Sequence, residues 1–376
     1  MRILELNRWL APGGGERFIV DLSNALAEYP ENEVFVCTFV DETLCKEYSF
    51  YKKQLNGSIH YQNLKGSLSF YGKIRSLFTV FNYVRKIKPD VIHCHLQAYY
   101  YALLPLFFLK NVRVVNTLHN VAQKNIKKGL DKRLKSFFYR HGVQGVTISS
   151  VCYESFSSYM KFNNTVLIDN GCRDIQPTKK FDEVKAEIAS YKKDNNTKVF
   201  VNVARVHPAK NHILLIKAFN RILAAGYNVT LLIIGATHDY PEIKEQLDKI
   251  ISDSRIRFLG VKDNVQDYLF CSDAFCLSSK WEGAPISLLE AGFAGCYPLC
   301  TPVGGCRDTI CNDDWGMLSK DLSVEEYSAM LKRFITMDKT LSREQIANLY
   351  KRKYSISSCA SKYMQVFRGL HDSDKK

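Results

Sequence analysis

Two glutamates, Glu282 and Glu290, lie eight positions apart in the segment SKWEGAPISLLEAGFAG. Pro285 between them suits the first turn of a helix, because its fixed φ and missing N–H cost least there. The N–H groups that no helical carbonyl accepts would face outward near Gly283, and such a helix N-terminus attracts anions. At about 1.5 Å per residue, Glu290 lies only about 7–8 Å further along the helix. One ligand could therefore contact both carboxylates, although an ordinary amphipathic helix with two solvated glutamates gives the same pattern.

Two cations in the segment VARVHPAKNH favour a ligand site. Arg205 stands at the end of an expected strand, and Lys210 stands at the start of the helix that follows. In an open α/β sheet, ligands bind beyond the carboxyl ends of the strands. Arginine can bind a phosphate with two parallel hydrogen bonds, and lysine adds a mobile point charge. Together they could hold a leaving diphosphate without a metal ion, although either cation alone could be a surface charge.

A glycine loop, APGGGERF, follows the first expected strand and contains Gly13 and Gly14. Backbone amides in such a loop can approach a phosphate, and a simple glycine turn is the alternative. The loop matches neither G-x-G-x-x-G nor G-x-x-x-x-G-K-S/T, so it does not indicate a dinucleotide site or a P-loop.

Three histidines end expected strands. His119 closes the segment VVNTLHN, where a side chain faces the crevice beyond the sheet, while His93 and His95 end the segment VIHCH. A structural role inside the fold is the alternative for His93 and His95. No metal site is expected, because the one D-x-D triplet, Asp372–Asp374, lies in a polar tail.

The length and composition allow two α/β domains, since 376 residues with 46% hydrophobic content can build two sizeable cores. Strand-like runs alternate with helical periodicity, which indicates parallel sheets covered by helices on both faces. We expect a first Rossmann-like domain over residues 1–171, a polar linker region over 172–196, and a second Rossmann-like domain over 197–353. Residues 354–376 form a C-terminal helix and tail, and this helix packs on the second domain or crosses back to the first.

The formal net charge of +14 indicates a partner of opposite sign. Basic and aromatic residues are mixed in residues 73–88 and 124–141, as in helices that lie on an anionic membrane surface. Core-packing helices with solvated outer faces are the alternative. Without a zinc-finger, RNP or helix-turn-helix pattern, nucleic acid is not an expected partner. The opening strand lacks the apolar core of a signal peptide, and the twelve cysteines suit a reducing compartment, so we expect a cytoplasmic protein.

Taken in order, the segments GGGER, VVNTLHN, DNG, VARVHPAKNH, FLGVKDNV, SSKWEGAPISLLEAGFAG and PVGG resemble glycosyltransferase family 4. This is a retaining family with the GT-B fold, in which two Rossmann-like domains face each other across a cleft. The resemblance implies that residues 1–171 form the acceptor-side domain and that residues 197–353 bind a nucleotide sugar. The residues implied to bind this donor are Gly14, Arg205, Lys210, Gly260, Val261, Glu282, Gly283, Ala284, Pro285, Ile286 and Glu290.

The roles within this set also follow from the resemblance. Arg205 and Lys210 bind the diphosphate, and Glu290 binds the ribose. Glu282 contacts the transferred sugar, with the backbone of residues 283–286, and His119 lies near the reacting centre. The implied catalytic residues are His119, Glu282, Arg205 and Lys210. The implied acceptor-side residues are Gly13, His93, His95 and Asn120.

The implied activity is a metal-independent, cofactor-free transfer of a hexosyl group with retention of configuration. The donor is a nucleotide sugar, with UDP favoured over GDP. The acceptor is a glycan, expected to be lipid-linked and used in cell-surface polysaccharide synthesis, with peripheral association at the inner face of the membrane. The alternatives are another GT-B enzyme, such as a nucleotide-sugar epimerase or a glycan phosphorylase, and a non-catalytic subunit that binds a glycan or a membrane.

Overall fold

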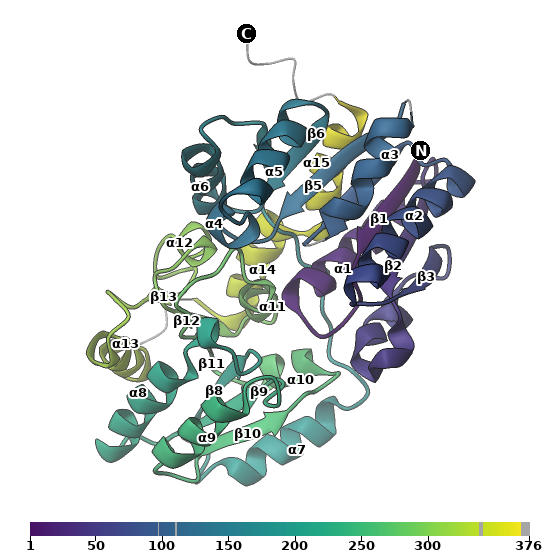
Figure 1. Ribbon diagram of the computed structural model, residues 1–376. Coiled ribbons are helices and arrows are strands. Elements are labelled where there is room, and N and C mark those ends of the chain that lie inside the picture. The colour runs from purple at the N-terminus through teal and green to yellow at the C-terminus, as the bar shows by residue number, and fades with distance from the viewer. Residues whose placement is uncertain (97, 110, 338–340, 370–376) are drawn as a thin grey trace. The chain divides into compact units, whose positions relative to one another are not determined.

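The structure is a computed structural model that describes residues 1–96, 98–109, 111–337 and 341–369. The chain divides into two compact units (Figure 1). The first unit combines Met1–Arg173 with Tyr354–Lys376, and the second unit is Asp174–Lys353. The triplet Asp372–Asp374 lies outside the described residues.

The first unit is built on a seven-stranded parallel sheet with the strand order β3-β2-β1-β4-β5-β6-β7. Its strands are β1 (Arg2–Asn7), β2 (Glu33–Val40), β3 (His60–Gly66), β4 (Val91–His95), β5 (Arg113–Leu118), β6 (Val143–Thr147) and β7 (Thr165–Leu167). Apolar runs such as EVFVCTFV in β2 are buried from the second residue on, as expected for a strand covered on both faces. The strand order reverses between β1 and β4, and ligands bind at such a switch point in open sheets.

Helices cover this sheet, and three of them, α2, α6 and α15, begin at a serine cap. The helices are α1 (Gly14–Ala27), α2 (Phe70–Ile87), α3 (Leu103–Phe108), α4 (Ala122–Asn125), α5 (Leu130–Arg140), α6 (Ser150–Met160) and α15 (Ile356–Arg368), with short 3₁₀ turns at Glu42–Leu44, Lys46–Ser49, Lys52–Gln54 and Ala98–Ala102. For example, the Ser69 hydroxyl accepts a hydrogen bond from the Gly72 N–H (3.1 Å) and caps α2.

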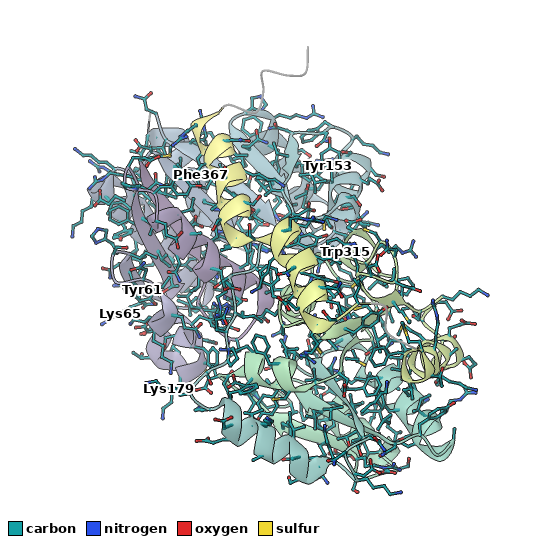
Figure 2. The ribbon with its side chains drawn as sticks, turned by 180° about the vertical axis from the view of Figure 1, so that it is seen from behind. Tyr61, Lys65, Tyr153, Lys179, Trp315 and Phe367 are labelled. Carbon is teal, nitrogen blue, oxygen red and sulfur yellow. The ribbon has the colours of Figure 1, made fainter. Side chains whose placement is uncertain are left out.

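The C-terminal helix α15 packs on the first unit. Figure 2 shows it with Phe367 labelled near its end. The Phe367 ring meets the ring of His93 edge to face at 5.3 Å, and the Tyr363 hydroxyl lies 2.9 Å from the Thr117 hydroxyl of β5. Of the two placements that the sequence allowed for this helix, the structure has the one on the first domain.

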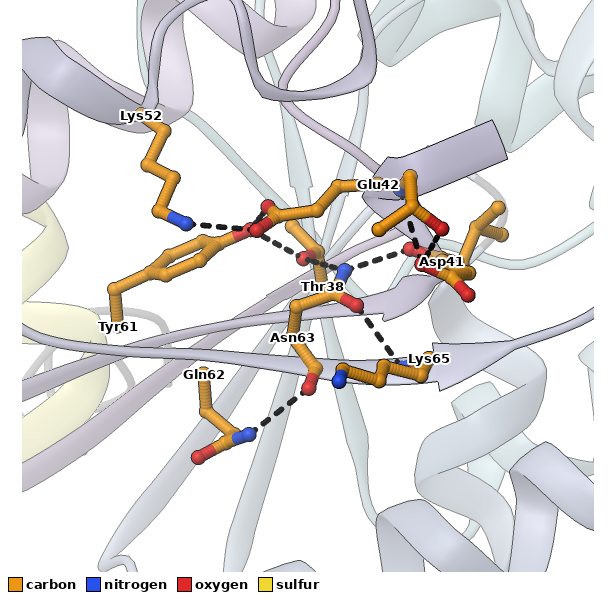
Figure 3. Close-up of polar contacts among 10 residues, drawn as sticks. Thr38, Asp41, Glu42, Lys52, Tyr61, Gln62, Asn63 and Lys65 are labelled. Atoms are coloured by element: carbon orange, nitrogen blue, oxygen red, sulfur yellow. Dashed lines mark hydrogen bonds and ion pairs between the residues drawn. The ribbon is translucent and has the colours of Figure 1, made fainter. Parts of the chain in front are cut away.

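A polar network closes the β2–β3 edge of the first sheet (Figure 3). The Asn63 amide donates to the Thr38 hydroxyl (2.9 Å), and the Tyr61 hydroxyl donates to a Glu42 carboxylate oxygen (2.6 Å). Lys52 pairs with the other oxygen of Glu42 at 2.7 Å. These bonds tie the 3₁₀ turns after β2 to the edge strand β3, and no part of the expected site lies here.

The second unit contains a six-stranded parallel sheet with the order β10-β9-β8-β11-β12-β13. Its strands are β8 (Lys198–Val203), β9 (Val229–Ile234), β10 (Ile256–Gly260), β11 (Ala274–Leu277), β12 (Tyr297–Cys300) and β13 (Met317–Leu318). Its helices are α7 (Phe181–Tyr191), the 3₁₀ turn η5 (Pro208–Lys210), α8 (His212–Ala224), α9 (Pro241–Ile250), α10 (Val265–Cys271), α11 (Ile286–Phe293), α12 (Gly305–Thr309), α13 (Val324–Thr336) and α14 (Arg343–Tyr354). The two parallel sheets confirm the predicted α/β fold class.

The polar region 172–196 contributes a packed helix to the second unit. Glu187 in α7 accepts a hydrogen bond from the Tyr268 hydroxyl of α10 at 2.6 Å. Deeper in this unit, the Phe200 ring of β8 contacts Phe219 and Phe334 edge to face at 5.2 and 5.6 Å. Each such fully buried ring contributes about 1.5–3 kcal/mol, so β8 is firmly held where its loop turns toward the site.

Among the described residues, no helix is both long enough and apolar enough to cross a membrane.

Candidate functional site

The switch point of the second sheet lies between β8 and β11. The loops that follow these two strands carry Lys210 and Glu282, and the Lys210 Nζ lies 2.6 Å from the Glu282 Oε1. Glu282 is only 8% exposed, so it is not one of two solvated surface glutamates. A short contact between an ammonium and a nearly buried carboxylate is a strong, charge-assisted hydrogen bond. The burial of Glu282 and its contact with Lys210 therefore favour a ligand site in this segment.

Hydrogen bonds between the two loops fix this pair. The Lys280 N–H donates to the Ala209 carbonyl at 2.7 Å, and the Ser278 hydroxyl donates to the Lys210 carbonyl at 2.9 Å. The Ser279 hydroxyl donates to the same Glu282 oxygen that Lys210 contacts. The carboxylate is thus oriented before any ligand binds, which is the arrangement that catalytic and binding sites require.

Two glycines of the PVGG segment, Gly304 and Gly305, pack against the backbone of Glu282 and Gly283. Gly304 has a φ of +49°, and a Cβ atom there would lie 1.9 Å from the Glu282 carbonyl oxygen. The Gly305 N–H donates to the Gly283 carbonyl at 2.9 Å. A side chain at Gly304 would therefore displace the Glu282 backbone. The sequence resemblance contained PVGG without assigning it this supporting role, and it did not assign one to Ser278 or Ser279.

Arg205 and the glycines of neighbouring loops lie at the same edge of the sheet. Gly235 after β9 has a φ of +153°, and a Cβ there would lie 2.3 Å from the Ala204 carbonyl oxygen. Its N–H donates to the carbonyl of Gly260, the last residue of β10, at 2.9 Å. Arg205 is half-exposed and lies 3.5 Å from the Asp239 carboxylate. The carboxyl ends of the three neighbouring strands β8, β9 and β10 therefore lie close together near Arg205. Val261 follows Gly260 and is exposed.

The electrostatics of this edge favour an anion. Burial, and then the nearby cations Arg205 and Lys210, lower the pKa of His207 below its ordinary value. Burial is the larger cause of this shift, and the two cations add to it because they oppose a further positive charge on the ring. The same two cations would attract a phosphate group.

Helix α11 starts one residue later than expected. Pro285 is its N-cap, with φ −72° and ψ 118°, and Ile286 is the first helical residue. The prediction that Pro285 lies in the first turn is therefore wrong by one position, because its extended ψ ends the preceding loop. Glu290 lies one turn into α11 and is partly buried, while Ala284 stands in the loop between Glu282 and the helix.

In the first unit, the glycine loop lies at the switch point between β1 and β4. Gly13 is the extended N-cap of α1, and Gly14 is the first helical residue and is exposed. A Cβ at Gly13 would lie 2.4 Å from a Glu16 carboxylate oxygen, and Trp9 donates its indole N–H to that carboxylate at 3.2 Å. The Glu16 side chain thus folds back over the loop, and a side chain at Gly13 would have to displace the Glu16 carboxylate.

His119 stands directly after β5 and is partly exposed. Its Nε2 lies 3.1 Å from the Nδ1 of His95, and its ring meets Phe18 of α1 edge to face at 5.8 Å. Next to it, the Asn120 side chain accepts a hydrogen bond from the Val121 N–H at 2.9 Å. The structure therefore places His119 and Asn120 at the carboxyl edge of the first sheet, where each residue keeps part of its surface exposed.

His93 and His95 lie inside the sheet and have no exposed surface. Both rings bond to Glu5 of β1, which the sequence did not single out. A ligand at the edge of the sheet can reach His119, but it cannot touch the two buried rings. The structure therefore does not support direct contact between these two histidines and an acceptor.

Comparison with known families identifies the family of this chain. The family model of the glycosyl transferases group 1 matches residues 183–352, and that of glycosyltransferase family 4 matches residues 12–173. The two matched segments cover most of both units. The chain belongs to the family 4 glycosyltransferases and has the GT-B fold.

Curated relatives resemble this glycosyltransferase over much of its length. An uncharacterized glycosyltransferase, MJ1059, of Methanocaldococcus jannaschii is 24% identical over 65% of this chain and 66% of its own length. A UDP-Gal:alpha-D-GlcNAc-diphosphoundecaprenol alpha-1,3-galactosyltransferase of Escherichia coli is 25% identical over 80% of each chain. The glycosyltransferase also superposes on Anabaena Alr3699/HepE, solved in complex with UDP and glucose, with a TM-score of 0.78 and 15% identity, over 98% of this chain and 100% of that one.

These findings confirm the family that the sequence motifs indicated, and with it the class of enzyme. The family match extends to both units, whereas the glycine loop alone is weak evidence for the family. The individual roles of Arg205, Lys210, Glu282 and Glu290 in this glycosyltransferase stay predictions.

Proposed function

We propose that this glycosyltransferase transfers a hexosyl group from a UDP-sugar to a lipid-linked glycan, with retention of configuration, in the synthesis of a cell-surface polysaccharide. The contact between Lys210 and Glu282 at the switch point of the second sheet carries the proposal. The Escherichia coli relative, named as a UDP-galactose enzyme that acts on a diphosphoundecaprenol-linked sugar, supports the donor and the acceptor. The UDP and glucose named in the Anabaena complex support the choice of UDP over GDP.

In the proposed reaction, the acceptor hydroxyl attacks the anomeric carbon from the face that the diphosphate leaves. The bond between this carbon and the phosphate oxygen breaks, a new carbon–oxygen bond forms, and the hydroxyl proton passes to the leaving diphosphate. Negative charge grows on the diphosphate, where Arg205 and Lys210 supply two cations. Such preorganised charges stabilise the transition state by several kcal/mol.

The carboxylates have binding roles in this proposal. Glu282 orients Lys210 and accepts hydrogen bonds from sugar hydroxyls, while Glu290, one turn into α11, accepts them from the ribose. Neither acts as a nucleophile. Because Arg205 and Lys210 supply positive charge at the leaving diphosphate, the proposed reaction uses neither a metal ion nor a cofactor.

A donor screen tests the proposal. The purified protein is incubated with UDP- and GDP-hexoses and an undecaprenyl-diphosphate-linked acceptor, and nucleotide release and glycan mass are measured. We expect UDP release with a product one hexose heavier, unchanged in EDTA. Activity that is lost in EDTA and restored by Mn²⁺ would contradict metal independence. Release of nucleotide without a heavier glycan would contradict the transfer.

We also infer that the first unit binds an anionic membrane surface. Helices α2, α3 and α5 are linked by ring contacts, Phe81 with Phe108 at 6.0 Å and Phe107 with the buried Phe138 at 5.3 Å. The large apolar residues exposed on and beside these helices are Leu68, Phe70, Tyr71, Ile74, Phe78, Phe107, Phe108, Leu130, Leu134 and Phe137. We call this set the apolar face. So many exposed rings beside basic residues favour membrane binding over solvated outer faces.

Lys135, one of the basic residues in 124–141 that we expected at the membrane, does not belong to this face. Lys135 is buried, and its ammonium group donates to the Asn125 carbonyl at 2.7 Å and lies 3.5 Å from Asp131. Burial lowers its pKa. It therefore holds the middle of α5 against the end of α4 and is not available to a lipid headgroup.

A further inference from the structure

A carboxylate and two histidines lie together in the core of the first unit. Glu5 in β1 is the register partner of His93 in β4, and His95 stands two residues later on the same face of that strand. All three side chains have no exposed surface. The His95 Nε2 lies 2.6 Å from the Glu5 Oε2, and the His93 Nδ1 lies 3.1 Å from the Oε1.

Two branches of the hydrogen-bond network lead out of this cluster. One branch runs from the His95 Nδ1 to the Nε2 of His119, 3.1 Å away at the edge of the sheet. The other runs from the His93 Nε2 to the Thr117 hydroxyl at 2.8 Å, and from there to the Tyr363 hydroxyl of α15 at 2.9 Å. The cluster therefore connects a buried carboxylate to the partly exposed His119.

The distances identify this cluster as hydrogen-bonded, although a glutamate and two histidines could also bind a metal ion. Zinc holds its ligands at about 2.0–2.1 Å in a tetrahedron, which separates neighbouring ligand atoms by about 3.3 Å. The 2.6 Å between His95 and Glu5 is shorter than that and matches a charge-assisted hydrogen bond. The oxygen that bonds His95 also lies 3.0 Å from the His93 Nδ1, so one oxygen accepts from both rings.

The protons of the first branch can be assigned from the carboxylate outward. Burial raises the pKa of Glu5, but the two histidines outweigh it and lower this pKa to about 2, so Glu5 is ionised at neutral pH. An ionised carboxylate only accepts hydrogen bonds, so the His95 Nε2 carries a proton. Burial lowers the pKa of His95 to about 4, so this ring is neutral and its Nδ1 has a lone pair.

The tautomer and the charge of His119 follow from its contact with His95 in the same way. Its Nε2 faces the lone pair of His95 and must donate a proton to it. Burial, and then the nearby His95, lower the pKa of His119, so this ring is also neutral. The remaining nitrogen of His119, Nδ1, is therefore a hydrogen-bond acceptor.

We propose that Glu5 is a positioning residue, which acts through His95 to hold His119 in the Nε2–H tautomer and so presents the His119 Nδ1 as an acceptor for a substrate hydroxyl. The identity of the ligand rests on the function proposed above; the tautomer does not. A neutral acceptor accepts from the O–H of a sugar, whereas it repels the oxygen of a phosphate, which has no proton to donate at neutral pH. The Nδ1 of His119 thus selects a hydroxyl over a phosphate group.

Nitrogen NMR of the protein labelled with ¹⁵N-histidine tests the tautomer without any substrate. Long-range ¹H–¹⁵N correlations separate the two neutral tautomers and the imidazolium, and a His119→Ala spectrum assigns the His119 signals. At pH 7 we expect one Nε2–H form for His119 in the wild type. An Nδ1–H form, a mixture or an imidazolium overturns the proposal, and this result needs no variant in the buried cluster. One equivalent of metal retained by the purified protein also overturns it.

Two variants then separate the branches. Glu5→Leu removes the acceptor of the His95 Nε2–H, and we expect His119 to lose its single form. Tyr363→Phe removes a hydroxyl from the other branch, and we expect the His119 pattern of the wild type. A wild-type pattern in Glu5→Leu, or its loss in Tyr363→Phe, contradicts the role of Glu5. A protein with the expected tautomer that transfers no sugar refutes the proposed function and leaves the positioning role of Glu5 intact.

Discussion

The Lys210 ammonium and the Glu282 carboxylate are 72 positions apart in the sequence and 2.6 Å apart in the structure. Each follows one of the two strands that flank the switch point of the second sheet. The pair satisfies both charges in the absence of a ligand, yet the lysine side chain keeps 24% of its surface exposed. A bound diphosphate can therefore share the Lys210 cation with Glu282 without unfolding the loop.

Replacing Lys210 by alanine tests this charge. Removing one charge-assisted contact to the leaving group should cost about 2–4 kcal/mol of transition-state stabilisation, a fall of roughly 30- to 1000-fold in kcat. Arg205→Ala should fall in the same range. The matched control is Lys244→Ala, which removes a lysine from the exposed pair with Asp248 in the same unit. Near-wild-type turnover in both Lys210→Ala and Arg205→Ala would contradict the assignment of these two residues to the leaving diphosphate.

Gly304→Ala should reduce transfer by moving the Glu282 backbone. Its Cβ would lie 1.9 Å from the Glu282 carbonyl oxygen. Gly226→Ala is a matched control, since Gly226 also has a positive φ, +83°, but a Cβ there meets nothing within 4 Å. Both changes place an alanine at a positive φ, which is strained for any side chain, so the thermal stability of each variant is measured first. Only Gly304→Ala should also lower kcat, by at least about tenfold. Equal kcat values for the two folded variants would show that the contact with Glu282 does not matter.

Much of the fold could be predicted from the sequence, because alternating strand and helix patterns are local signals. The carboxyl ends of parallel strands gather at one edge, so Arg205, Lys210 and Glu282 could be assigned to one site before their contacts were known. The exact helix start could not be predicted, since Pro285 suits both the N-cap and the first turn.

The part that could not be predicted depends on register between distant strands. Glu5 stands in an ordinary strand pattern, ILEL, and nothing in its neighbours indicates that His93 is its partner across the sheet. His93 and His95 were therefore expected to contact a ligand, although they are buried against Glu5. Lys135 was counted with the membrane cations for a similar reason, because its bond to the Asn125 carbonyl depends on the packing of two helices.

The buried histidines predict how stability changes with pH. Burial lowers the pKa of both His95 and His212 to about 4, from an ordinary value of 6.5. Each neutral ring therefore stabilises the fold above pH 6.5, and this stabilisation is lost as the pH falls from 6.5 toward 4. By linkage, each group contributes up to about 3 kcal/mol. We expect the midpoint of urea unfolding to fall steeply between pH 6.5 and 4.5.

The variant His95→Phe isolates one of these groups. It keeps an aromatic ring in the core but cannot titrate, so its urea midpoint should change less between pH 6.5 and 4.5 than that of the wild type. Its midpoint at pH 7.5 serves as the reference for the cost of the substitution itself. An identical pH dependence in the two proteins would mean that His95 is not held neutral in the folded state.

The apolar face predicts how the protein binds vesicles. Phe70, Tyr71 and Phe78 are 73%, 83% and 58% exposed, so replacing all three by serine should leave the core of the first unit intact. Because each ring that enters the lipid interface contributes on the order of 1 kcal/mol, we expect at least about a tenfold weaker partition into anionic vesicles in a flotation assay. Leu44→Ser is the control, since Leu44 is 62% exposed in the 3₁₀ turn Glu42–Leu44, outside the apolar face. Wild-type flotation that is equal on neutral and anionic vesicles would exclude the role of the basic residues, and unchanged flotation of the triple variant would exclude that of the rings.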